Sequence, residues 1–267
     1  MMLRLIATDL DGTLLEPNGQ IPDGTHEVIR ELQEMGILFA AASGRQHANL
    51  RQLFGPVADD MAYVCENGAV SILNGEIVNA IPIDADMAKA IISDIEKLGM
   101  NVMISGRHVT YMLDRNRQFT DDILYRLRNA SHIISSWDHI TEPMLKISGH
   151  MASGVHEIAP YLLEKWGDKL TATISGFDWF DFTIANKGMG MEKLMEHMGI
   201  QKEEVAAFGD NFNDESMLDC VGHPFIMAQA DPRLHKPGYH LCPKVVPMLQ
   251  AIVKAKGDIK TALQLCE

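Results

Sequence analysis

The chain opens with an apolar run that leads directly into two aspartates and a Gly-Thr turn, at residues 3–13 (LRLIATDLDGT). The uninterrupted apolar residues 5–7 are typical of a strand that is buried on both faces of a parallel sheet. Asp9 and Asp11 then lie in the loop at the carboxyl end of this strand, the edge where open α/β sheets bind ligands. Two carboxylates held this close repel each other unless a cation or different environments separate their roles. We therefore predict a divalent-metal site at this edge.

Helical and strand patterns alternate through the first part of the chain. Apolar residues at helical spacing predict a helix over 23–35, and the apolar run that follows predicts a strand over 37–42. A helix over 46–53 and a strand over 62–65 repeat this order. Such alternation is typical of an α/β protein with a doubly wound parallel sheet.

The pattern changes between residues 82 and 185, where short strands and helices are mixed. Alternation returns after Asn186, with a helix over 191–198, a strand over 205–208, a helix over 215–219 and a strand over 224–227 that completes the sheet. We therefore predict a catalytic core made of residues 1–81 and 186–267. Residues 82–185 are predicted to form an α+β domain inserted into it.

Composition excludes some classes of partner. The 267 residues, 46% of them apolar, can bury a substantial core, and the net charge of -13 without a Lys/Arg cluster argues against nucleic acid. The sequence has no uncharged apolar run long enough to span a membrane and no leader-like start, so we expect a cytoplasmic protein without membrane contact. The four cysteines are widely separated, which indicates neither a zinc site nor a disulfide framework.

Three further points carry chemistry that fits the two aspartates. Ser43-Gly44-Arg45 follows a predicted strand and offers a hydroxyl and backbone N–H groups at a helix start, which can hold an anion. Lys187 opens a predicted helix and could neutralise a phosphoryl oxygen. Residues 209–214 (GDNFND) follow another buried strand and supply the oxygen ligands that Mg²⁺ prefers. Taken singly, each of these could equally be a helix cap or a solvated surface residue.

In this order, DxDGT, SGR, a lone lysine and GDxxND resemble the haloacid dehalogenase-like (HAD) superfamily, and the insertion resembles that of its Cof-type, C2B-capped phosphatases. The resemblance covers nearly the whole chain and implies a HAD-like Rossmannoid core with a substrate-selecting cap over 82–185. It implies that Asp9 is the nucleophile that forms an aspartyl-phosphate. It also implies that Asp11 is the general acid and base, which protonates the leaving group and then activates water.

The same resemblance implies a cofactor and its ligands. Mg²⁺ would be held by the Asp9 carboxylate, the Asp11 main-chain carbonyl and the Asp210 carboxylate, with Asp214 supporting them from behind. The phosphoryl group would be bound by a set of donors around it: Leu10, Ser43, Gly44, Lys187 and Asn213. One loop differs from the resembling chains, because Gln229 stands where a Met-x-Asn-Ala segment commonly has asparagine.

The implied activity is Mg²⁺-dependent hydrolysis of sugar phosphates or similar small phosphomonoesters, with a small phosphorylated metabolite as the partner. We expect a monomer or a weak dimer. Two alternatives stay open: a sugar phosphomutase that uses the same nucleophile, and a non-catalytic sensor of phosphorylated metabolites. The presence of Asp11 argues against the sensor, because a protein that only binds has no need of an acid/base group.

Overall fold

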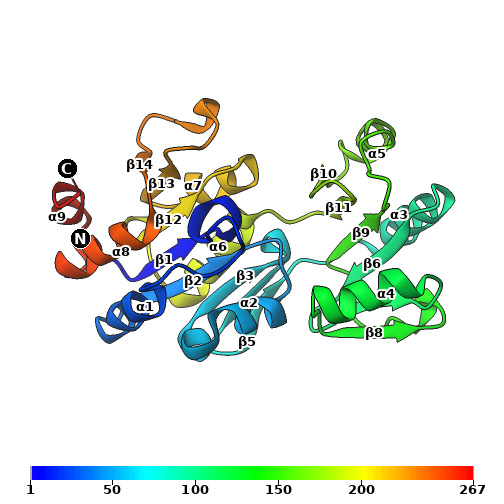
Figure 1. Cartoon of the computed structure of the whole chain (residues 1–267), viewed down its shortest axis with the longest axis horizontal. Coiled ribbons are helices and arrows are strands. Elements are labelled where there is room, and N and C mark those ends of the chain that lie inside the picture. The colour runs from blue at the N-terminus through cyan, green and yellow to red at the C-terminus, as the bar shows by residue number, and fades with distance from the viewer. Residues whose placement is uncertain (1, 267) are drawn as a thin grey trace. The chain divides into compact units, whose positions relative to one another are not determined.

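The computed structural model describes residues 2–266 and consists of two compact units (Figure 1). The core unit joins the chain up to Asn79 to the chain from Asn186 onward, and the inserted unit is Ala80–Ala185. Among the described residues, no helix has the length and apolar character needed to cross a bilayer.

An eight-stranded sheet forms the centre of the core unit within residues 2–266. Its strands follow the order β14-β13-β12-β1-β2-β3-β4-β5. Their bounds are β1 (Leu5–Thr8), β2 (Leu38–Ala42), β3 (Ala62–Cys65), β4 (Val70–Leu73), β5 (Glu76–Ala80), β12 (Val205–Gly209), β13 (His223–Met227) and β14 (His240–Cys242). Neighbouring strands from β14 to β3 are parallel, and β4 pairs with β3 in the antiparallel sense. The predicted α/β fold with a doubly wound sheet is confirmed.

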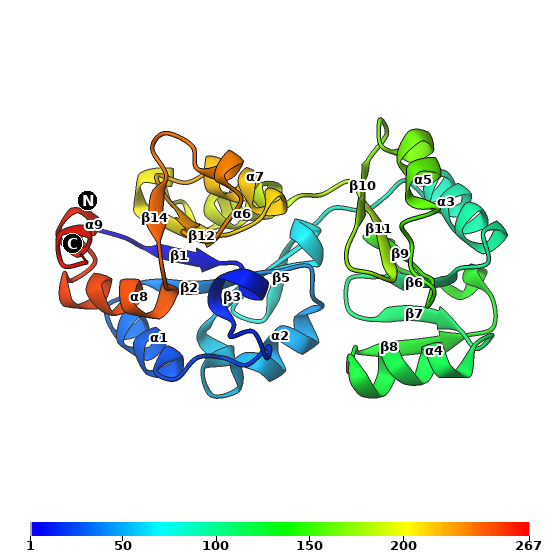
Figure 2. The same ribbon diagram turned by 45° about the horizontal axis from the view of Figure 1, so that its top comes forward.

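Helices cover both faces of this sheet (Figure 2). They are α1 (Thr25–Glu34), α2 (His47–Phe54), α6 (Lys187–Met198), α7 (Glu215–Asp219), α8 (Val245–Lys254) and α9 (Ile259–Gln264). Helices α6 and α7 bury Met191, Leu194 and Met217 against one face, while α1, α2 and α8 lie on the other face. This double cover explains why β1 is buried along its whole length and reads as an unbroken apolar run.

Several core elements were not predicted. The prediction that strand 224–227 completes the sheet is wrong, because β14 follows it in the sheet and α8 and α9 follow in the chain. It also missed the β4–β5 hairpin, whose two turn residues Asn74 and Gly75 both have positive φ, 53° and 77°. An Asn-Gly pair between two short strands is a strong signal for a tight hairpin turn. Helix α6 spans Lys187–Met198, so it begins at Lys187, as predicted for that residue, and extends the helical range 191–198 by four residues.

The inserted unit contains its own mixed sheet, in the order β10-β11-β9-β6-β7-β8. Its elements are α3 (Ala85–Lys97), β6 (Asn101–Ser105), β7 (Thr110–Leu113), α4 (Arg117–Asp121), β8 (Ser131–Ile134), β9 (Lys146–His150), α5 (Ala159–Trp166), β10 (Thr171–Ile174) and β11 (Trp179–Thr183). One apolar cluster joins α3 and α5 to one face of the sheet. A second cluster, with Met103, Met112 and Phe119, joins α4 to the other face.

Candidate active site

Three charged side chains meet at the carboxyl edge of the core sheet. Asp9 directly follows β1, Asp214 precedes α7, and Lys187 is the first residue of α6. The Lys187 ammonium donates to Asp9 Oδ1 (2.5 Å) and to Asp214 Oδ1 (2.6 Å). Their side chains are 0%, 10% and 0% exposed for Lys187, Asp9 and Asp214, so this ion-pair network is screened very little by water.

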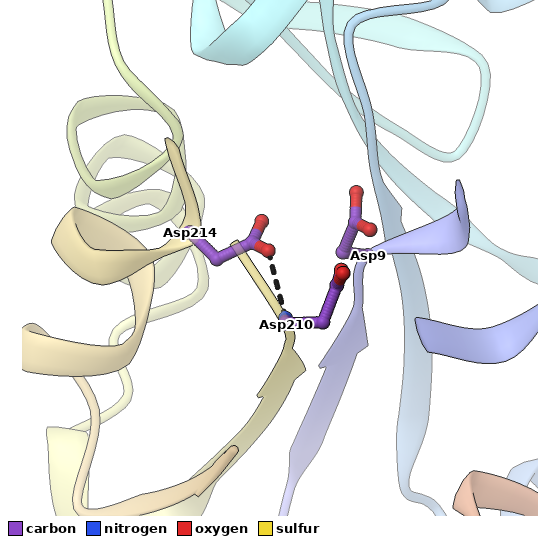
Figure 3. Close-up of side chains that lie close together, drawn as sticks. All are labelled: Asp9, Asp210 and Asp214. Carbon is purple, nitrogen blue, oxygen red and sulfur yellow. Dashed lines mark hydrogen bonds between the residues drawn. The ribbon is translucent and has the colours of Figure 1, made fainter. Parts of the chain in front are cut away.

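Asp214 also fixes the loop that carries Asp210. Its Oδ2 accepts the backbone N–H groups of Asp210 and Asn211, each at 3.0 Å. Figure 3 shows the bond to Asp210 and the three carboxyl groups that converge from the ends of two neighbouring strands. Because both Asp214 oxygens already accept hydrogen bonds, this residue is better placed to hold Lys187 and the loop than to bind a metal directly.

Asp210 is positioned by the turn that follows β1. The Thr13 hydroxyl donates to Asp210 Oδ1 at 2.8 Å. Gly12 lies against the same carboxylate with a φ of +90°, and a Cβ there would come within 2.3 Å of Asp210 Oδ2. The position therefore requires glycine twice over, for its backbone conformation and for the space beside Asp210.

The chemistry of this cluster fits a divalent metal. Carboxylate oxygens of Asp9, Asp210 and Asp214 lie within 4.8 Å of one another. Against three carboxylates the cluster has one ammonium, from Lys187, which leaves two negative charges when all are ionised. Carboxylate oxygens are the ligands that Mg²⁺ prefers, and its double charge would offset this excess. Asp9 and Asp210 would supply the direct ligands.

Burial and neighbouring charges shift the pKa values of this cluster. Burial raises the pKa of Asp9 to about 7, against the lowering effect of Lys187, and the Asp214 carboxylate raises it further. Burial also raises the pKa of Asp210. For Lys187, burial acts to lower the pKa, but Asp9 and Asp214 outweigh burial and raise it. A cation near Asp9 and Asp210 would favour their ionised forms.

Ser43 and Gly44 follow β2, the strand that pairs with β1. The loop after β3 supports them, because Asn67 N–H donates to the Ser43 carbonyl at 3.0 Å. A Cβ at Gly44 would lie only 3.1 Å from the Asn67 side-chain oxygen. Ser43 Oγ accepts the Arg45 N–H at 3.3 Å, which folds the loop into the turn predicted for an anion site.

The same loop after β3 allows α6 to begin close to the sheet edge. Gly68 has a φ of +95°, and a Cβ there would be 2.0 Å from the Asn186 carbonyl. Asn186 Oδ1 in turn accepts the Met189 N–H at 2.9 Å and caps α6. The close approach at Gly68 and this cap together place the buried Lys187 at the first turn of the helix.

The remaining predicted residues lie around this centre. The Asp11 side chain is 62% exposed. It accepts two hydrogen bonds from the Arg45 guanidinium, at 2.6 and 3.2 Å. The Leu10 backbone N–H bonds to the Asp9 carboxylate. Asn213 is exposed on the loop that carries Asp210. The structure thus brings Asp9, Lys187 and the acidic loop into direct contact, and their roles in catalysis stay predictions.

Two residues of the predicted motifs make contacts within the site. Thr13 bonds to Asp210, and Arg45 bonds to Asp11, although neither was assigned a part in the site from the sequence. Both residues stand inside the DGT and SGR motifs, so their position was the available signal. The partners could not be identified from spacing, since Thr13 and Asp210 are 197 residues apart.

Known proteins are similar to this chain in sequence and in fold. The family model for haloacid dehalogenase-like hydrolases matches residues 6–245. An Escherichia coli O8 (strain IAI1) protein named HMP-PP phosphatase is 27% identical over 256 residues, covering 90% of this chain and 89% of its own. A haloacid dehalogenase-like hydrolase from B. subtilis superposes with a TM-score of 0.78 at 24% identity, covering 93% and 99% of the two chains.

A solved HAD subclass IIB sugar phosphatase also has this fold, with a TM-score of 0.74 at 21% identity and 98% coverage of both chains. The resemblance to Cof-type HAD hydrolases that the motifs indicated is confirmed, and with it the prediction of an enzyme. Because the family model extends over most of the sequence, the chain belongs to the haloacid dehalogenase-like hydrolase family.

Proposed function

We propose that the protein is a Mg²⁺-dependent phosphatase that hydrolyses small phosphomonoesters through a phosphorylated Asp9. The observation that carries this proposal is the buried Asp9 carboxylate, hydrogen-bonded to Lys187 inside a cluster with more carboxylates than cations. Such a cluster favours a divalent cation, and with it a substrate that carries a phosphate dianion. Relatives named HMP-PP phosphatase, at 26–27% identity, support phosphoryl chemistry.

In the first half-reaction, an Asp9 carboxylate oxygen attacks phosphorus, the new O–P bond forms, and the bond to the leaving oxygen breaks. Lys187, with the Ser43 hydroxyl and backbone N–H groups, stabilises the charge that spreads over the other phosphoryl oxygens. Asp11 donates a proton to the departing alkoxide. Mg²⁺ held by Asp9, Asp210 and the Asp11 carbonyl would supply the positive charge that lets a phosphate dianion approach a carboxylate.

In the second half-reaction, Asp11 removes a proton from water, which attacks phosphorus and restores the Asp9 carboxylate with release of phosphate. The Arg45 guanidinium, which donates two hydrogen bonds to the Asp11 carboxyl group, would hold this group in place beside the attacking water. The first half-reaction needs a protonated Asp11, so the contact with Arg45 has to open before the leaving group departs.

The inserted unit is proposed to act as the cap that selects the leaving group, as the resemblance to C2B-capped phosphatases implied for residues 82–185. Sugar phosphates and similar metabolites are the proposed substrate class. The protein would act on them as small soluble phosphomonoesters, without nucleic acid as a partner.

Phosphate release from a panel of sugar phosphates, nucleotides and HMP-PP tests the proposal, with Mg²⁺ and with EDTA. Asp9→Asn should stay folded, as thermal unfolding can show, and lose release by roughly a thousandfold or more. Asp168→Asn, at an exposed position of the inserted unit, is the matched control and should match wild type. A folded Asp9→Asn protein with full turnover would refute the phospho-Asp9 mechanism, and an isomeric product without phosphate release would indicate a mutase.

A further inference from the structure

A glutamine that follows β13, two strands away from β1 in the sheet, reaches the turn beside the proposed metal ligands. Gln229, two residues after β13, donates from Nε2 to the Gly12 carbonyl at 2.9 Å. The two residues are 217 positions apart in the sequence. Gly12 is the residue whose Cα lies against the Asp210 carboxylate, and Thr13, which bonds to that carboxylate, comes next.

The segment that begins with Gln229 is also fixed to the acidic loop and to α7. The Arg233 guanidinium lies over the Phe212 ring, 4.9 Å from its centroid. Lys236 pairs with Glu215 at 2.9 Å and with Asp219 at 2.7 Å. The segment from Gln229 to Lys236 therefore contacts both loops that supply the proposed Mg²⁺ ligands: the turn after β1 and the loop after β12.

Gln229 and Gly12, which the hydrogen bond joins, both line a cleft in the core unit. This cleft has a volume of about 540 Å³ and is bordered by residues 11–17, Gln229 and residues 243–247. The turn after β1 borders this cleft, so packed side chains do not hold the Gly12 carbonyl on the side that faces the cleft. The amide of Gln229 supplies a directional tie at that point, and a hydrogen bond fixes a carbonyl within a few tenths of an ångström.

We propose that Gln229 is a positioning residue for the Mg²⁺ site. Its hydrogen bond holds the Gly12 carbonyl, which keeps the glycine against Asp210 and the Thr13 hydroxyl within reach of Asp210 Oδ1. This inference rests on the proposed function, because it concerns the same metal site. Groups that orient a metal ligand without touching the metal commonly change metal affinity by about ten- to a hundredfold, and one neutral, exposed hydrogen bond lies at the low end.

Gln229→Met tests the proposal, because methionine has a similar length and volume but no hydrogen-bond donor. Calorimetric titration of the purified protein with Mg²⁺ should show an affinity roughly three- to tenfold weaker than wild type. The unfolding temperature without metal should stay at the wild-type value. In turnover assays, the Mg²⁺ concentration for half-maximal rate should rise by the same factor, while kcat at saturating Mg²⁺ stays near wild type.

Two further variants separate positioning from general stability. Gln229→His restores a ring N–H donor and should recover most of the Mg²⁺ affinity at about pH 8, where the unperturbed imidazole is neutral. Gln52→Met, at an exposed position of α2, should bind Mg²⁺ like wild type. Wild-type Mg²⁺ affinity in Gln229→Met would overturn the inference. So would a fall in metal-free stability that Gln229→His repairs without any change in Mg²⁺ affinity.

The titration also keeps this inference distinct from the proposed function. Wild-type protein that binds Mg²⁺ but releases no phosphate from any substrate would reject the proposed activity and leave the role of Gln229 open to the same measurement. Wild-type protein that binds no Mg²⁺ would reject both.

Discussion

Within residues 2–266, both units bury charged side chains, and two of these buried clusters differ in their balance of charge. In the inserted unit, Lys146 on β9 faces Asp181 on the neighbouring β11 at 3.8 Å, and their side chains are 6% and 7% exposed. In the core unit, a single ammonium from Lys187 faces the carboxylates of Asp9 and Asp214, with Asp210 beside them.

This difference separates a structural ion pair from a binding site. A buried pair of opposite charges has already met its need for a counter-ion, although desolvation often leaves it with little net stabilising effect. In the core cluster, burial is the main cause of the raised pKa values of Asp9 and Asp210, and the Asp214 carboxylate raises both further. The sheet edge of the core unit is therefore where the proposed cation would bind.

Removal of divalent metal should have the largest effect, and only the charge cluster of the core unit should respond to it. EDTA should lower turnover by roughly a thousandfold or more, because the surplus charge at Asp9 and Asp210 would then repel a phosphate dianion. Added Mg²⁺ at a hundred times its Kd should restore activity and stabilise the fold by about 2.7 kcal/mol. Thermal unfolding by circular dichroism, with and without EDTA, measures the second effect. Full turnover in EDTA would contradict the assignment of the core cluster as a metal site.

The two buried lysines offer the next largest contrast. Lys187→Met and Lys146→Met should each lower the free energy of unfolding by about 3–5 kcal/mol, because each leaves buried carboxylate charge without its partner. Mg²⁺ should recover part of the loss in Lys187→Met, since a cation at Asp9 and Asp210 replaces some of the missing positive charge. It should recover none in Lys146→Met, whose partner Asp181 lies in the inserted unit.

Urea denaturation of both variants with and without Mg²⁺ measures this contrast. All three tryptophans of the chain, Trp137, Trp166 and Trp179, lie in the inserted unit, so their fluorescence reports on that unit and circular dichroism reports on both. Lys146→Met combined with Asp181→Leu should regain much of the lost stability, because the unpaired charge is removed with its partner. Equal recovery of the two single variants by Mg²⁺ would show that charge balance does not distinguish the clusters.

The sequence predicted which residues meet at the sheet edge better than it predicted the contacts that support them. Asp9 and Lys187 could be assigned because each stands at the end of a recognisable strand or the start of a helix, and the edge of a parallel sheet brings such positions together. The contacts of Thr13 with Asp210 and of Gln229 with Gly12 depend on strand order and side-chain rotamers, which no local pattern contains. The β4–β5 hairpin was missed although its Asn74-Gly75 turn carried a local signal.

A substitution at Gly12 tests whether displacement of Asp210, the proposed metal ligand, has an effect beyond that of backbone strain. Gly12→Ala should lose about 1–2 kcal/mol from its positive φ, and the new methyl group should push Asp210 aside and lower Mg²⁺ affinity by about tenfold or more. Gly36→Ala is the matched control, because Gly36 has a φ of +76° and no atom within 4 Å of an added Cβ. It should lose similar stability and bind Mg²⁺ normally. Calorimetric Mg²⁺ titration decides, and equal affinities in the two variants would reject the positional role of Gly12.

The last expected effect is a pH dependence of the stabilisation by Mg²⁺. The folded-state pKa of Asp9 is raised to about 7 from an ordinary value of 3.8, so between these values the metal-free folded state binds more protons than the unfolded state. Its contribution to metal-free stability therefore falls as pH rises from about 4 to about 7. Mg²⁺ requires the ionised carboxylate and reverses this trend, because below the raised pKa protons compete with the metal for Asp9.

The shift in unfolding temperature caused by a fixed Mg²⁺ concentration should therefore grow between about pH 5.5 and about pH 8, with Mg²⁺ affinity rising by up to about tenfold per pH unit below the pKa. In Asp9→Asn the amide cannot titrate, so the remaining Mg²⁺ effect should depend much less on pH. Lys146→Met leaves the core cluster unchanged and should keep the full pH dependence. A Mg²⁺ shift that is the same across this range in wild type would show that Asp9 stays ionised without metal, and the surplus negative charge of the core cluster would then have to be compensated by another group.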